Sequence, residues 1–420
     1  MWGVARDRML KLDEEILLLS INSEDKVQRV QLPPFPSSRP LFVGVSVAKV
    51  QDRIVLVGGG AERQLQPTST KPSSTESEEK AINGTQVPTM NRPVQSSSVA
   101  LKTVERINIR TKEDFDSIIN RVQPVILTGL EIGPCVSLWT PEYLLSKIGA
   151  DRPVIVHSCP TSRMTFQTKN FSYIKQSFGE FMADVTAGKQ LYLRSVASTQ
   201  PAKHATNLSK DFPAIAADFR LPDALASATE NMHSSPLRIS GPVILWLHYD
   251  VLANVLCQIR GTKRLRLYPP GDVAHLAYPP GSSSSNIDVY APAEELSDAQ
   301  RTELLKTHPH EAFLRPGDVL FIPPAWSHTA KPEEGLSVAV NCFWRNLDAG
   351  VYAQGRDVYG NRDIAAYEEG RKAVEKVAKG FEGVPKDLQR FYLERLVGEL
   401  REKVEALDVD GNGVGGEESG

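Results

Sequence analysis

Three residues of this chain have the types and the spacing of a metal site. His248 and Asp250 are separated by one residue, and His328 follows far downstream at the end of the segment 323–328. In a β-strand, residues i and i+2 point to the same face, so His248 and Asp250 can bind one ion together. Two imidazoles and one carboxylate form the facial set that holds non-haem Fe(II) and leaves positions open. We therefore predict that His248, Asp250 and His328 bind iron.

The sequence before His328 predicts a rigid frame for that side chain. Gly317 and Asp318 indicate a turn, residues 319–322 indicate a buried strand, and two consecutive prolines fix the corner that follows. Zinc would more often be held with thiolates or with a third histidine, which favours iron. The remaining histidines lack such a context, and we interpret them as ordinary core or surface residues: His157, His204, His233, His275, His308 and His310.

Length, composition and charge bound the class of protein. The chain has 420 residues, which is long enough for two or three domains, and its 41% hydrophobic content is ample for a sizeable core. The formal net charge is only −3, from 48 basic and 51 acidic residues, so no overall field favours nucleic acid or membranes as partners. We therefore expect a soluble globular protein, and a local basic patch remains open.

The cysteines and the amino end indicate the compartment. Four single cysteines stand in apolar contexts without CxxC spacing, which predicts reduced, buried thiols and no disulfides: Cys135, Cys159, Cys257 and Cys342. No segment has the pattern of a signal peptide, and no apolar window approaches the length of a membrane span. We predict a cytoplasmic protein without a membrane partner, with the nucleus as the alternative.

Residues 1–62 have the pattern of short antiparallel strands. These strands are predicted at 15–21, 27–32, 46–50 and 53–60, and the last one ends in a glycine run. This region resembles the last repeat of a kelch propeller, so we interpret it as a partial kelch-like β repeat. One blade cannot bury its own faces without neighbours. We therefore expect a fragment of a longer protein, and the alternative is that these strands pack on the next domain.

Two segments lack the side chains that a packed core needs. Residues 63–100 are rich in Ser, Thr, Pro, Gln and Glu, which predicts a disordered linker. Residues 408–420 predict a flexible tail. The tail opens like a calcium loop at Asp408, but Ser419 stands where the loop needs its last carboxylate.

Residues 101–350 indicate a mainly β domain with helical additions. Helices are predicted at 112–120, 141–149 and 178–187, and strands at 106–109, 123–129, 154–157, 191–195, 242–248, 254–259, 263–268, 319–322 and 336–344. Many short strands with long loops, behind a mixed opening, predict a double-stranded β-helix, the jelly roll of the cupin kind.

Residues 351–407 predict a pair of C-terminal helices. Amphipathic patterns run over roughly 364–379 and 385–407, and the second carries apolar residues near helical spacing: Leu388, Phe391, Tyr392, Leu396, Leu400 and Val404. Two interpretations stay open. The helices either pack on the barrel or form a homodimer interface.

Several motifs of the β domain carry a family resemblance when they are taken together. They are PVILTG at 124–129, LYL at 191–193, HYD at 248–250, Asn254, QIRGTKR at 258–264, YPP at 268–270, Gly317-Asp318, PPAWSH at 323–328 and NCFW at 341–344. This arrangement resembles the JmjC family. It is most similar to the cupin-8 branch, which includes the asparaginyl hydroxylase of hypoxia-inducible factor and the tRNA wybutosine hydroxylase. The resemblance covers roughly residues 104–350.

The resemblance implies a second set of residues around the iron ligands. Lys263 lies thirteen residues after Asp250, where this branch places the lysine that pairs with the distal carboxylate of 2-oxoglutarate. A buried dianion needs one fixed cation, although a lysine among arginines is by itself more typical of a solvated basic face. Tyr192, Asn254 and Asn341 match positions that hydrogen-bond the co-substrate. The resemblance thus implies Fe(II) and 2-oxoglutarate as cofactors, whereas Trp326 and Trp344 are expected in the core.

One position departs from the family pattern. Three residues before the first iron histidine, the family often has a Thr or Ser that helps to anchor 2-oxoglutarate, and this chain has Leu245 there. The missing hydroxyl costs one hydrogen bond, on the order of 1 kcal/mol. It weakens the expectation of the co-substrate more than that of the metal.

The order of the regions resembles a multidomain family. A kelch-like blade, a linker and a JmjC unit look like the carboxy-terminal part of the fungal tRNA wybutosine-synthesizing protein 4 family. In that family a methyltransferase-like domain comes first, and no glycine-rich strand-turn-helix for S-adenosylmethionine occurs at the amino end here. The resemblance implies a role in making wybutosine, the modified guanosine next to the anticodon of phenylalanine tRNA.

Three functions follow as hypotheses from these motifs. The first is an Fe(II)/2-oxoglutarate-dependent dioxygenase that hydroxylates a C–H bond of a tRNA base or a protein side chain. The second is a non-catalytic JmjC module that binds tRNA or a protein, and Leu245 keeps this open. A histone lysine demethylase is less favoured, because the chain shows no reader domain and no zinc-binding cysteine cluster. For tRNA, the sequence offers one basic cluster: Arg260, Lys263, Arg264 and Arg266.

Overall fold

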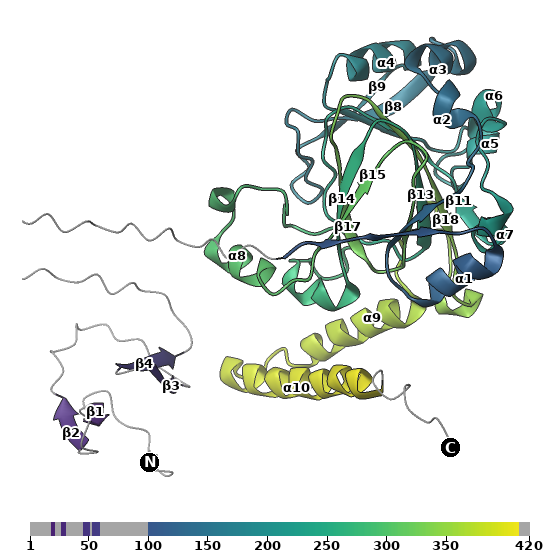
Figure 1. Cartoon of the computed structure of the whole chain (residues 1–420). Helices are drawn as coiled ribbons and strands as arrows, with labels where there is room; N and C mark the ends of the chain where they lie inside the picture. The colour runs from purple at the N-terminus through teal and green to yellow at the C-terminus, as the bar shows by residue number, and fades with distance from the viewer. Residues whose placement is uncertain (1–17, 22–26, 31–44, 51–52, 59–99, 411–420) are drawn as a thin grey trace, which may run out of the picture. The chain divides into compact units, whose positions relative to one another are not determined.

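A computed structural model describes residues 18–21, 27–30, 45–50, 53–58 and 100–410 of the chain (Figure 1). The chain divides into two compact units, Met1–Asn91 and Arg92–Gly420, and each is described by itself. The predicted linker falls outside the described residues except at its last residue, and so does nearly all of the predicted tail.

The first unit contains four described strands in two separate antiparallel pairs. They are β1 (Leu18–Ile21) with β2 (Val27–Val30), and β3 (Val45–Val50) with β4 (Arg53–Gly58). All four lie where the sequence predicts strands. They pair two by two instead of forming one four-stranded sheet, so the kelch-like repeat stays a prediction.

The second unit is built on two β-sheets, as predicted for a jelly roll. The large sheet has the order β6 (Glu105–Asn108), β7 (Val125–Thr128), β16 (Val319–Ile322), β13 (Ala253–Arg260), β18 (Ser337–Trp344), β12 (Leu237–Ser240), β10 (Leu191–Arg194), β8 (Pro153–Ser158) and β9 (Ser172–Ser177), and β11 (Met232–Ser234) also pairs with β18. The small sheet has the order β17 (Ser327–Pro332), β14 (Lys263–Tyr268), β15 (His310–Leu314) and β5 (Lys102–Thr103). The unit is therefore mainly β with helical additions.

Alternation along the central strands creates two hydrophobic layers. In β13, Val255 and Cys257 belong to a core beneath the helices, whereas Leu256 belongs to a core between the two sheets. Because neighbouring strand residues point to opposite faces, a strand covered on both sides is apolar throughout. Trp344 lies in the first core and Trp326 in the second, which confirms both as core residues.

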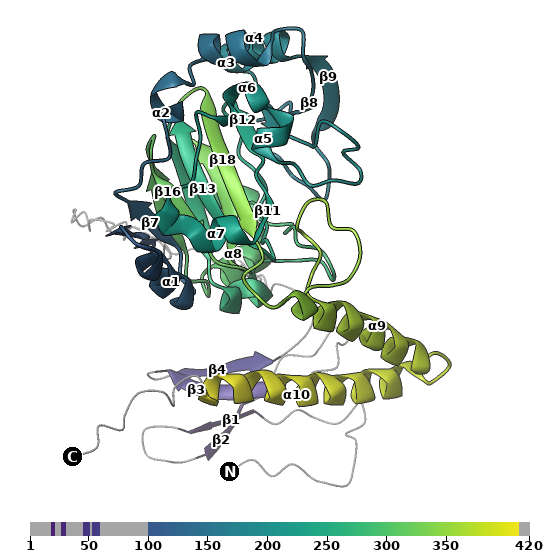
Figure 2. The same cartoon turned by 90° about the vertical axis from the view of Figure 1, so that its right-hand side faces the viewer.

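Helices cover the outer face of the large sheet, where α2 contacts β13 and α7 contacts β18 (Figure 2). The α-helices of this domain are α1 (Lys112–Asn120), α2 (Cys135–Leu138), α3 (Pro141–Ile148), α4 (Phe178–Thr186), α5 (Leu208–Asp211), α6 (Pro213–Ala216), α7 (Ala226–Glu230) and α8 (Asp298–Leu304). Short 3-10 helices are η1 (Asp223–Leu225), η2 (Pro270–His275), η3 (Ala293–Glu295) and η4 (Ala349–Val351). The three predicted helices correspond to α1, α3 and α4.

One predicted strand is wrong in its form. The segment 242–248 makes isolated bridges at Ile244 and His248 and no continuous ladder. Its backbone bonds are shared among three different segments: Met164 N–H donates to Ile244 O, Leu245 N–H donates to Ala330 O, and Ser285 N–H donates to Leu247 O. Because no single neighbouring strand runs along it, the chain is held by short contacts from loops and from β17.

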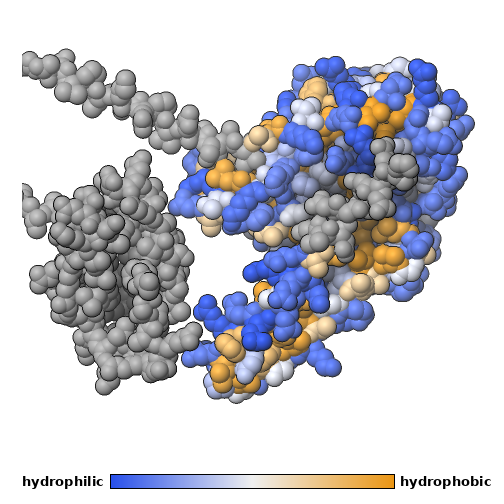
Figure 3. All heavy atoms as spheres, turned by 60° about the horizontal axis from the view of Figure 1, so that its bottom comes forward, coloured by the Kyte–Doolittle hydropathy of each residue, from blue (hydrophilic) through white to orange (hydrophobic). Residues whose placement is uncertain are grey.

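The C-terminal helices occur as predicted. They are α9 (Ala365–Gly380) and α10 (Lys386–Asp410), and Figure 3 shows hydrophobic side chains gathered along them. The exposed apolar residues of the two helices are Tyr367, Val374, Val377, Leu388, Phe391, Tyr392, Val397, Leu400, Val404 and Leu407. The four cysteines are buried and free, which confirms the predicted absence of disulfides among them. In the described residues, no helix is long and apolar enough to cross a membrane.

Candidate metal centre

His248, Asp250 and His328 lie together. One ligand atom of each residue lies within 4.8 Å of the others, and no other such group of His, Cys, Asp or Glu occurs among the described residues. The distance from His328 Nε2 to Asp250 Oδ2 is 3.6 Å. The two imidazole ring centroids are 4.4 Å apart. The three residues are therefore close enough for a single metal ion.

Both imidazoles are oriented by a carbonyl two residues earlier in the chain. His248 Nδ1 lies 3.1 Å from Trp246 O, and His328 Nδ1 lies 3.0 Å from Trp326 O. A carbonyl can only accept, so each Nδ1 carries the proton and donates it. Each Nε2 then keeps its lone pair free for a metal, while the Nδ1 hydrogen bond holds the ring in position.

The backbone fixes the relative positions of the two histidine segments. His248 N–H donates to His328 O (3.1 Å), and His328 N–H donates to His248 O (2.7 Å). At the proline corner, Ala325 adopts φ +63° and its N–H donates to Asp250 O (2.9 Å). A left-handed φ at a non-glycine residue costs free energy, and such strain concentrates at functional sites. The predicted corner thus ties the His328 segment directly to the Asp250 segment.

The electrostatics of the three residues suit a bound cation. Burial, followed by the neighbouring His328, lowers the pKa of His248 to about 4. Burial also lowers the pKa of His328. Both rings are therefore neutral near neutral pH, as metal ligands must be. Asp250 Oδ2 is buried and has no hydrogen-bond partner among the described residues, so a cation would satisfy it.

Lys263 is a buried cation near the same pocket. Lys263 is the first residue of β14. In this strand Lys263, Leu265 and Leu267 point inward and are buried. No described residue pairs with its ammonium group, and burial, followed by the charge of Arg238, lowers its pKa to about 7. An unpaired buried ammonium is unfavourable by itself. The site therefore fits an anion beside the metal ligands.

The alternation of β14 divides the predicted basic cluster. Arg264 points outward and pairs with Glu311 (2.7 Å) and Glu333 (2.9 Å). Arg266 also lies outside, where its Nη1 donates to Val289 O (2.7 Å). Lys263 is inside the barrel, so the cluster is not one continuous basic surface.

One pocket is lined by both histidines of the site and by Lys263. It encloses about 460 Å³ of empty space, part of it open to solvent, which is within the range of small-molecule sites. Its walls are formed by residues of both sheets and of the segment 243–248: Tyr192, Arg238, Ser240, Val243, Leu245, His248, Leu256, Lys263, Leu265, His328, Ala330, Pro332 and Asn341.

The other three predicted co-substrate residues lie at or behind this pocket. Tyr192 and Asn341 line it, whereas Asn254 stands behind Asn341 and accepts a hydrogen bond from its Nδ2 (3.1 Å). Asn341 Oδ1 and Asn254 Nδ2 are buried and have no partner among the described residues. Two unsatisfied amide groups at a pocket wall favour a polar ligand there.

Leu245 lines the pocket at the position where the family often has a hydroxyl. Its carbonyl accepts a hydrogen bond from Thr329 Oγ1 (2.5 Å). The hydroxyl of the threonine next to His328 is therefore bonded to the main chain. The hydroxyls that do line the pocket belong to Tyr192 and Ser240, which lie opposite each other in the β10–β12 register.

Two arginines near the site were not predicted from the sequence. Arg238 lines the pocket, and its Nη1 donates to the Tyr192 hydroxyl (2.7 Å). Arg194 lies directly opposite Arg238 on β10. The signal that could have revealed them is alternation, because Arg194 stands two residues after Tyr192 and must share its face. The strand that carries Arg238 was not predicted, so its pairing was not apparent.

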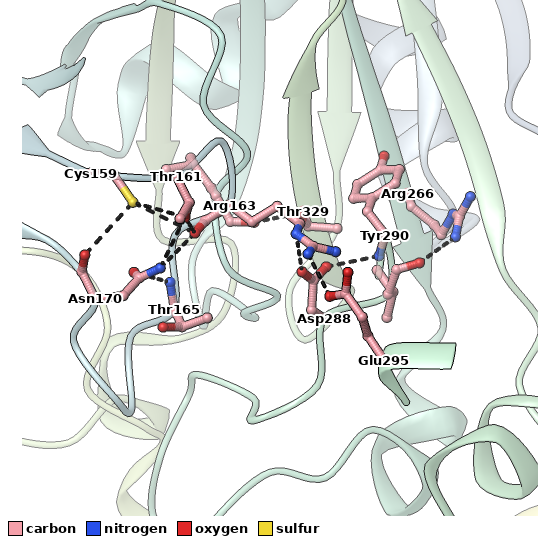
Figure 4. A network of polar contacts seen from close by, with 12 residues as sticks. Cys159, Thr161, Arg163, Thr165, Asn170, Arg266, Asp288, Tyr290, Glu295 and Thr329 are labelled. Carbon is pink, nitrogen blue, oxygen red and sulfur yellow. Dashed lines mark hydrogen bonds and ion pairs between the residues drawn. The ribbon is translucent and has the colours of Figure 1, made fainter. Parts of the chain in front are cut away.

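A second pocket lies beyond Leu245 and Trp246, between two loops. Figure 4 shows that Arg163 joins these loops. Its guanidinium pairs with Asp288 (3.3 Å) and Glu295 (2.5 Å), and its carbonyl accepts a hydrogen bond from Asn170 Nδ2 (2.7 Å). This network holds the loop after β8 against the loop between β14 and β15, next to the segment that carries His248.

Comparison with known proteins shows which proteins this chain resembles. Residues 111–350 match the family model of the cupin-like domain. The chain is 45% identical to tRNA wybutosine-synthesizing protein 4 of Emericella nidulans, over 96% of this chain and 42% of that protein. It is 37% identical to tRNA wybutosine-synthesizing protein 5 of Danio rerio, over 70% of this chain and 92% of that protein.

The human protein of the latter name is 32% identical, over 71% of this chain and 96% of that protein. Relatives named protein 4 are much longer than the present chain, which spans about two fifths of their length. Relatives named protein 5 are covered almost completely. The family match over more than half of the chain, together with the two-sheet fold, shows that the chain belongs to the cupin-like, JmjC-type domain family.

Proposed function

We propose that this chain is an Fe(II)/2-oxoglutarate-dependent oxygenase that hydroxylates a C–H bond during wybutosine biosynthesis. The observation that carries the proposal is a carboxylate without a partner among the metal ligands, next to a pocket that holds a buried lysine. Asp250 Oδ2 is buried without a partner beside two neutral imidazoles, and the buried Lys263 lines the same pocket as His248 and His328. A divalent cation and a dianion together would satisfy both. The printed names of the relatives support the pathway.

Each residue of the pocket has a distinct role in this proposal. His248, Asp250 and His328 hold the iron, and Lys263 pairs with the distal carboxylate of 2-oxoglutarate. Tyr192 and Asn341 hydrogen-bond the co-substrate, and Asn254 orients Asn341. When bound, iron and 2-oxoglutarate together supply the oxidising chemistry of the hydroxylation.

The apolar walls of the pocket strengthen these interactions. Residues without polar side-chain atoms surround the polar groups: Val243, Leu245, Leu256, Leu265, Ala330 and Pro332. They exclude water, and a charge pair in such surroundings is much stronger than in bulk solvent. In this environment the dianion would be held between Lys263 and the iron ligands.

A binding module without catalysis is the second candidate, and Leu245 favours it. The module would keep the barrel to bind tRNA or a protein, while the chemistry would belong to other domains. Leu245 removes one hydroxyl from the pocket, but Ser240 and Tyr192 still present two. The loss of one hydrogen bond, about 1 kcal/mol, reduces co-substrate affinity without abolishing it.

Turnover of 2-oxoglutarate to succinate by the full chain tests the proposal. We expect Fe(II)-dependent turnover in the wild-type protein and none in His248→Ala. His204→Ala is the matched control, because His204 is exposed and outside the site. If no Fe(II)-dependent turnover occurred, and wild type and His248→Ala bound tRNA equally well in a salt-sensitive way, the oxygenase would be ruled out in favour of the binding module. Absence of salt-sensitive tRNA affinity would remove tRNA as the partner.

We further propose that the protein forms a homodimer through α9 and α10. Both helices expose apolar side chains along their length, and Leu400 and Val404 are 61% and 62% exposed. Apolar residues at helical spacing that remain in water are typical of an interface. A second copy of the chain would cover this surface by pairing the same helices about a twofold axis.

A further inference from the structure

Arg194 and Arg238 form a like-charge pair inside the barrel. They lie directly opposite each other in the antiparallel register of β10 and β12. The pair Tyr192 and Ser240 lies two residues away along the same strands. Alternation gives Arg194 the same face as Tyr192, and gives Arg238 the same face as Ser240. Like charges at opposed positions of a sheet are destabilising. A fold retains such a pair only where some other group offsets the repulsion.

Neither arginine forms an ion pair with a carboxylate of the described residues, although the charge of Asp250 acts on Arg194. Arg194 forms no ion pair or side-chain hydrogen bond with the described residues, and its guanidinium lies 4.8 Å from the centroid of the Tyr359 ring. Arg238 gives one bond to the Tyr192 hydroxyl, while its Nε is buried without a partner. Burial lowers the pKa of Arg194, and the charge of Arg238 lowers it further. The pair is therefore electrostatically incomplete.

The register gives the position of this pair along the large sheet. Ser240 lies opposite Ser337 at the start of β18, and Arg238 lies opposite Ala339, two residues further along. At the far end of β18, Trp344 lies opposite Ala253, only three residues after Asp250. The charge of Asp250 thus acts on Arg194, whereas Arg238 lines the pocket beside Lys263 and acts on that lysine.

We infer that Arg194 and Arg238 bind an oxyanion, a carboxylate or a phosphate, that belongs to the molecule being oxidised. The inference rests on the proposed function, because it assigns Lys263 to the co-substrate and leaves the arginine pair for the second substrate. Guanidinium groups bind carboxylates and phosphates through two parallel hydrogen bonds, which fixes orientation as well as charge. The pair would select an anionic substrate and direct it toward the iron ligands.

A purely structural role for Arg194 is the competing explanation. In that case its contact with the Tyr359 ring would stabilise the fold, since such contacts contribute modestly at partly exposed sites. The two explanations predict opposite effects of Arg194→Gln in anion-free buffer. Relief of repulsion raises the melting temperature, whereas loss of a stabilising contact lowers it.

Anion binding can be measured in the full-length Lys263→Gln variant without metal or 2-oxoglutarate. This background removes the co-substrate cation and leaves the arginine pair in the pocket. Inorganic phosphate and acetate serve as separate probes in calorimetric titrations. We expect at least one probe to bind, and the added Arg194→Gln change to weaken it at least tenfold. Lys175→Gln in the same background is the control, because it removes one positive charge from exposed β9.

The outcomes separate the two sources of the oxyanion and decide the inference. Binding of phosphate alone indicates a nucleic-acid phosphate, and binding of acetate alone indicates a substrate carboxylate. Equal anion affinity with and without Arg194→Gln overturns the inference, and so does the absence of binding of either probe. Because this titration uses neither iron nor 2-oxoglutarate, a failure of the turnover assay would overturn the proposed function and leave this result unaffected.

Discussion

Asp250 Oδ2 lies 3.6 Å from His328 Nε2 and has no hydrogen-bond partner among the described residues. The imidazole cannot serve as its donor, because His328 Nδ1 carries the proton toward Trp326 O and the pKa of the ring is lowered. A buried carboxylate without a partner destabilises the fold. The relationship between these two residues is therefore unfavourable without a cation and favourable with one.

Asp250→Asn should separate metal affinity from stability. The amide removes the negative charge that binds the ion, so we expect Mn(II) affinity to fall by at least about 100-fold, since even an outer partner contributes 10- to 100-fold. The same change removes a buried charge, so the metal-free melting temperature should rise. Calorimetry and thermal denaturation measure the two effects. Asp223→Asn, at an exposed position, should change neither.

The histidines predict an unusual pH dependence of metal binding. Burial lowers the pKa of His248 to about 4, so the ring remains neutral well below the ordinary histidine value of about 6.5. Mn(II) affinity should therefore stay nearly constant from about pH 7 to about pH 5 and fall only near pH 4. A histidine of ordinary pKa would instead lose affinity from about pH 6.5 downward. Titrations across this range distinguish the two.

The same shift affects the metal-free fold. Between about pH 4 and about pH 6.5, the unfolded chain binds a proton at His248 that the folded protein does not. Stability must then rise with pH across this window, and acid should destabilise the protein. His248→Gln should flatten that part of the profile of unfolding free energy against pH. An unchanged slope in the variant would contradict the assigned pKa.

The sequence predicts the site residues that belong to local motifs, but not the site residues that become neighbours only through strand pairing. His248, Asp250, His328 and Lys263 stand at fixed spacings in the chain. The structure brings the first three within ligand distance of one another, and one pocket is lined by both histidines and by Lys263. Arg194 and Arg238 are 44 positions apart in the numbering of the chain and become neighbours only through the β10–β12 register. Short polar strands such as β12 lack the hydrophobic run that would predict them.

The form of the His248 segment illustrates the same limit. Alternation correctly predicted that His248 and Asp250 lie close together, but it implied a regular strand that does not form. The segment is extended because β17 and two loops hold it at separate points. Such tertiary contacts have no local signature in the sequence.

Binding of 2-oxoglutarate should take up a proton through Lys263. Burial lowers the pKa of this ammonium to about 7, so above that pH the free protein is largely deprotonated there. A dianion favours the charged form, so affinity should fall as pH rises above about 7. Calorimetry in buffers of different ionisation enthalpy measures the uptake. Lys263→Arg stays charged and should show no uptake, and a pH-independent affinity of the wild type would contradict the mechanism.

Substitutions on α10 test the dimer. Leu400→Glu combined with Val404→Glu places two charges in the proposed interface, so the mass from light scattering should change from a dimer to a monomer. Charged groups without partners are strongly unfavourable in an apolar interface. Arg401→Glu, at an exposed position beside Leu400, is the control and should leave the dimer intact. A monomeric wild type at micromolar concentration would rule out the dimer.

Leu245→Thr should restore the hydroxyl that the pocket lacks. Leu245 lines the co-substrate pocket beside Lys263 and His328, so a threonine there would present its oxygen to the ligand. One added hydrogen bond of about 1 kcal/mol corresponds to roughly fivefold tighter 2-oxoglutarate binding. Anaerobic titration with Fe(II) would follow this through the charge-transfer absorption of the bound complex.

Leu245→Val is the control for this comparison, because it reduces the side chain to the size of threonine without adding a hydroxyl. If the valine variant bound 2-oxoglutarate as tightly as the threonine variant, the gain would come from space and not from a hydrogen bond. If neither variant differed from the wild type, the side chain at this position would make no contact with the co-substrate. Ser240 and Tyr192 would then be the hydroxyls that anchor it, and Ser240→Ala should weaken binding by a similar factor.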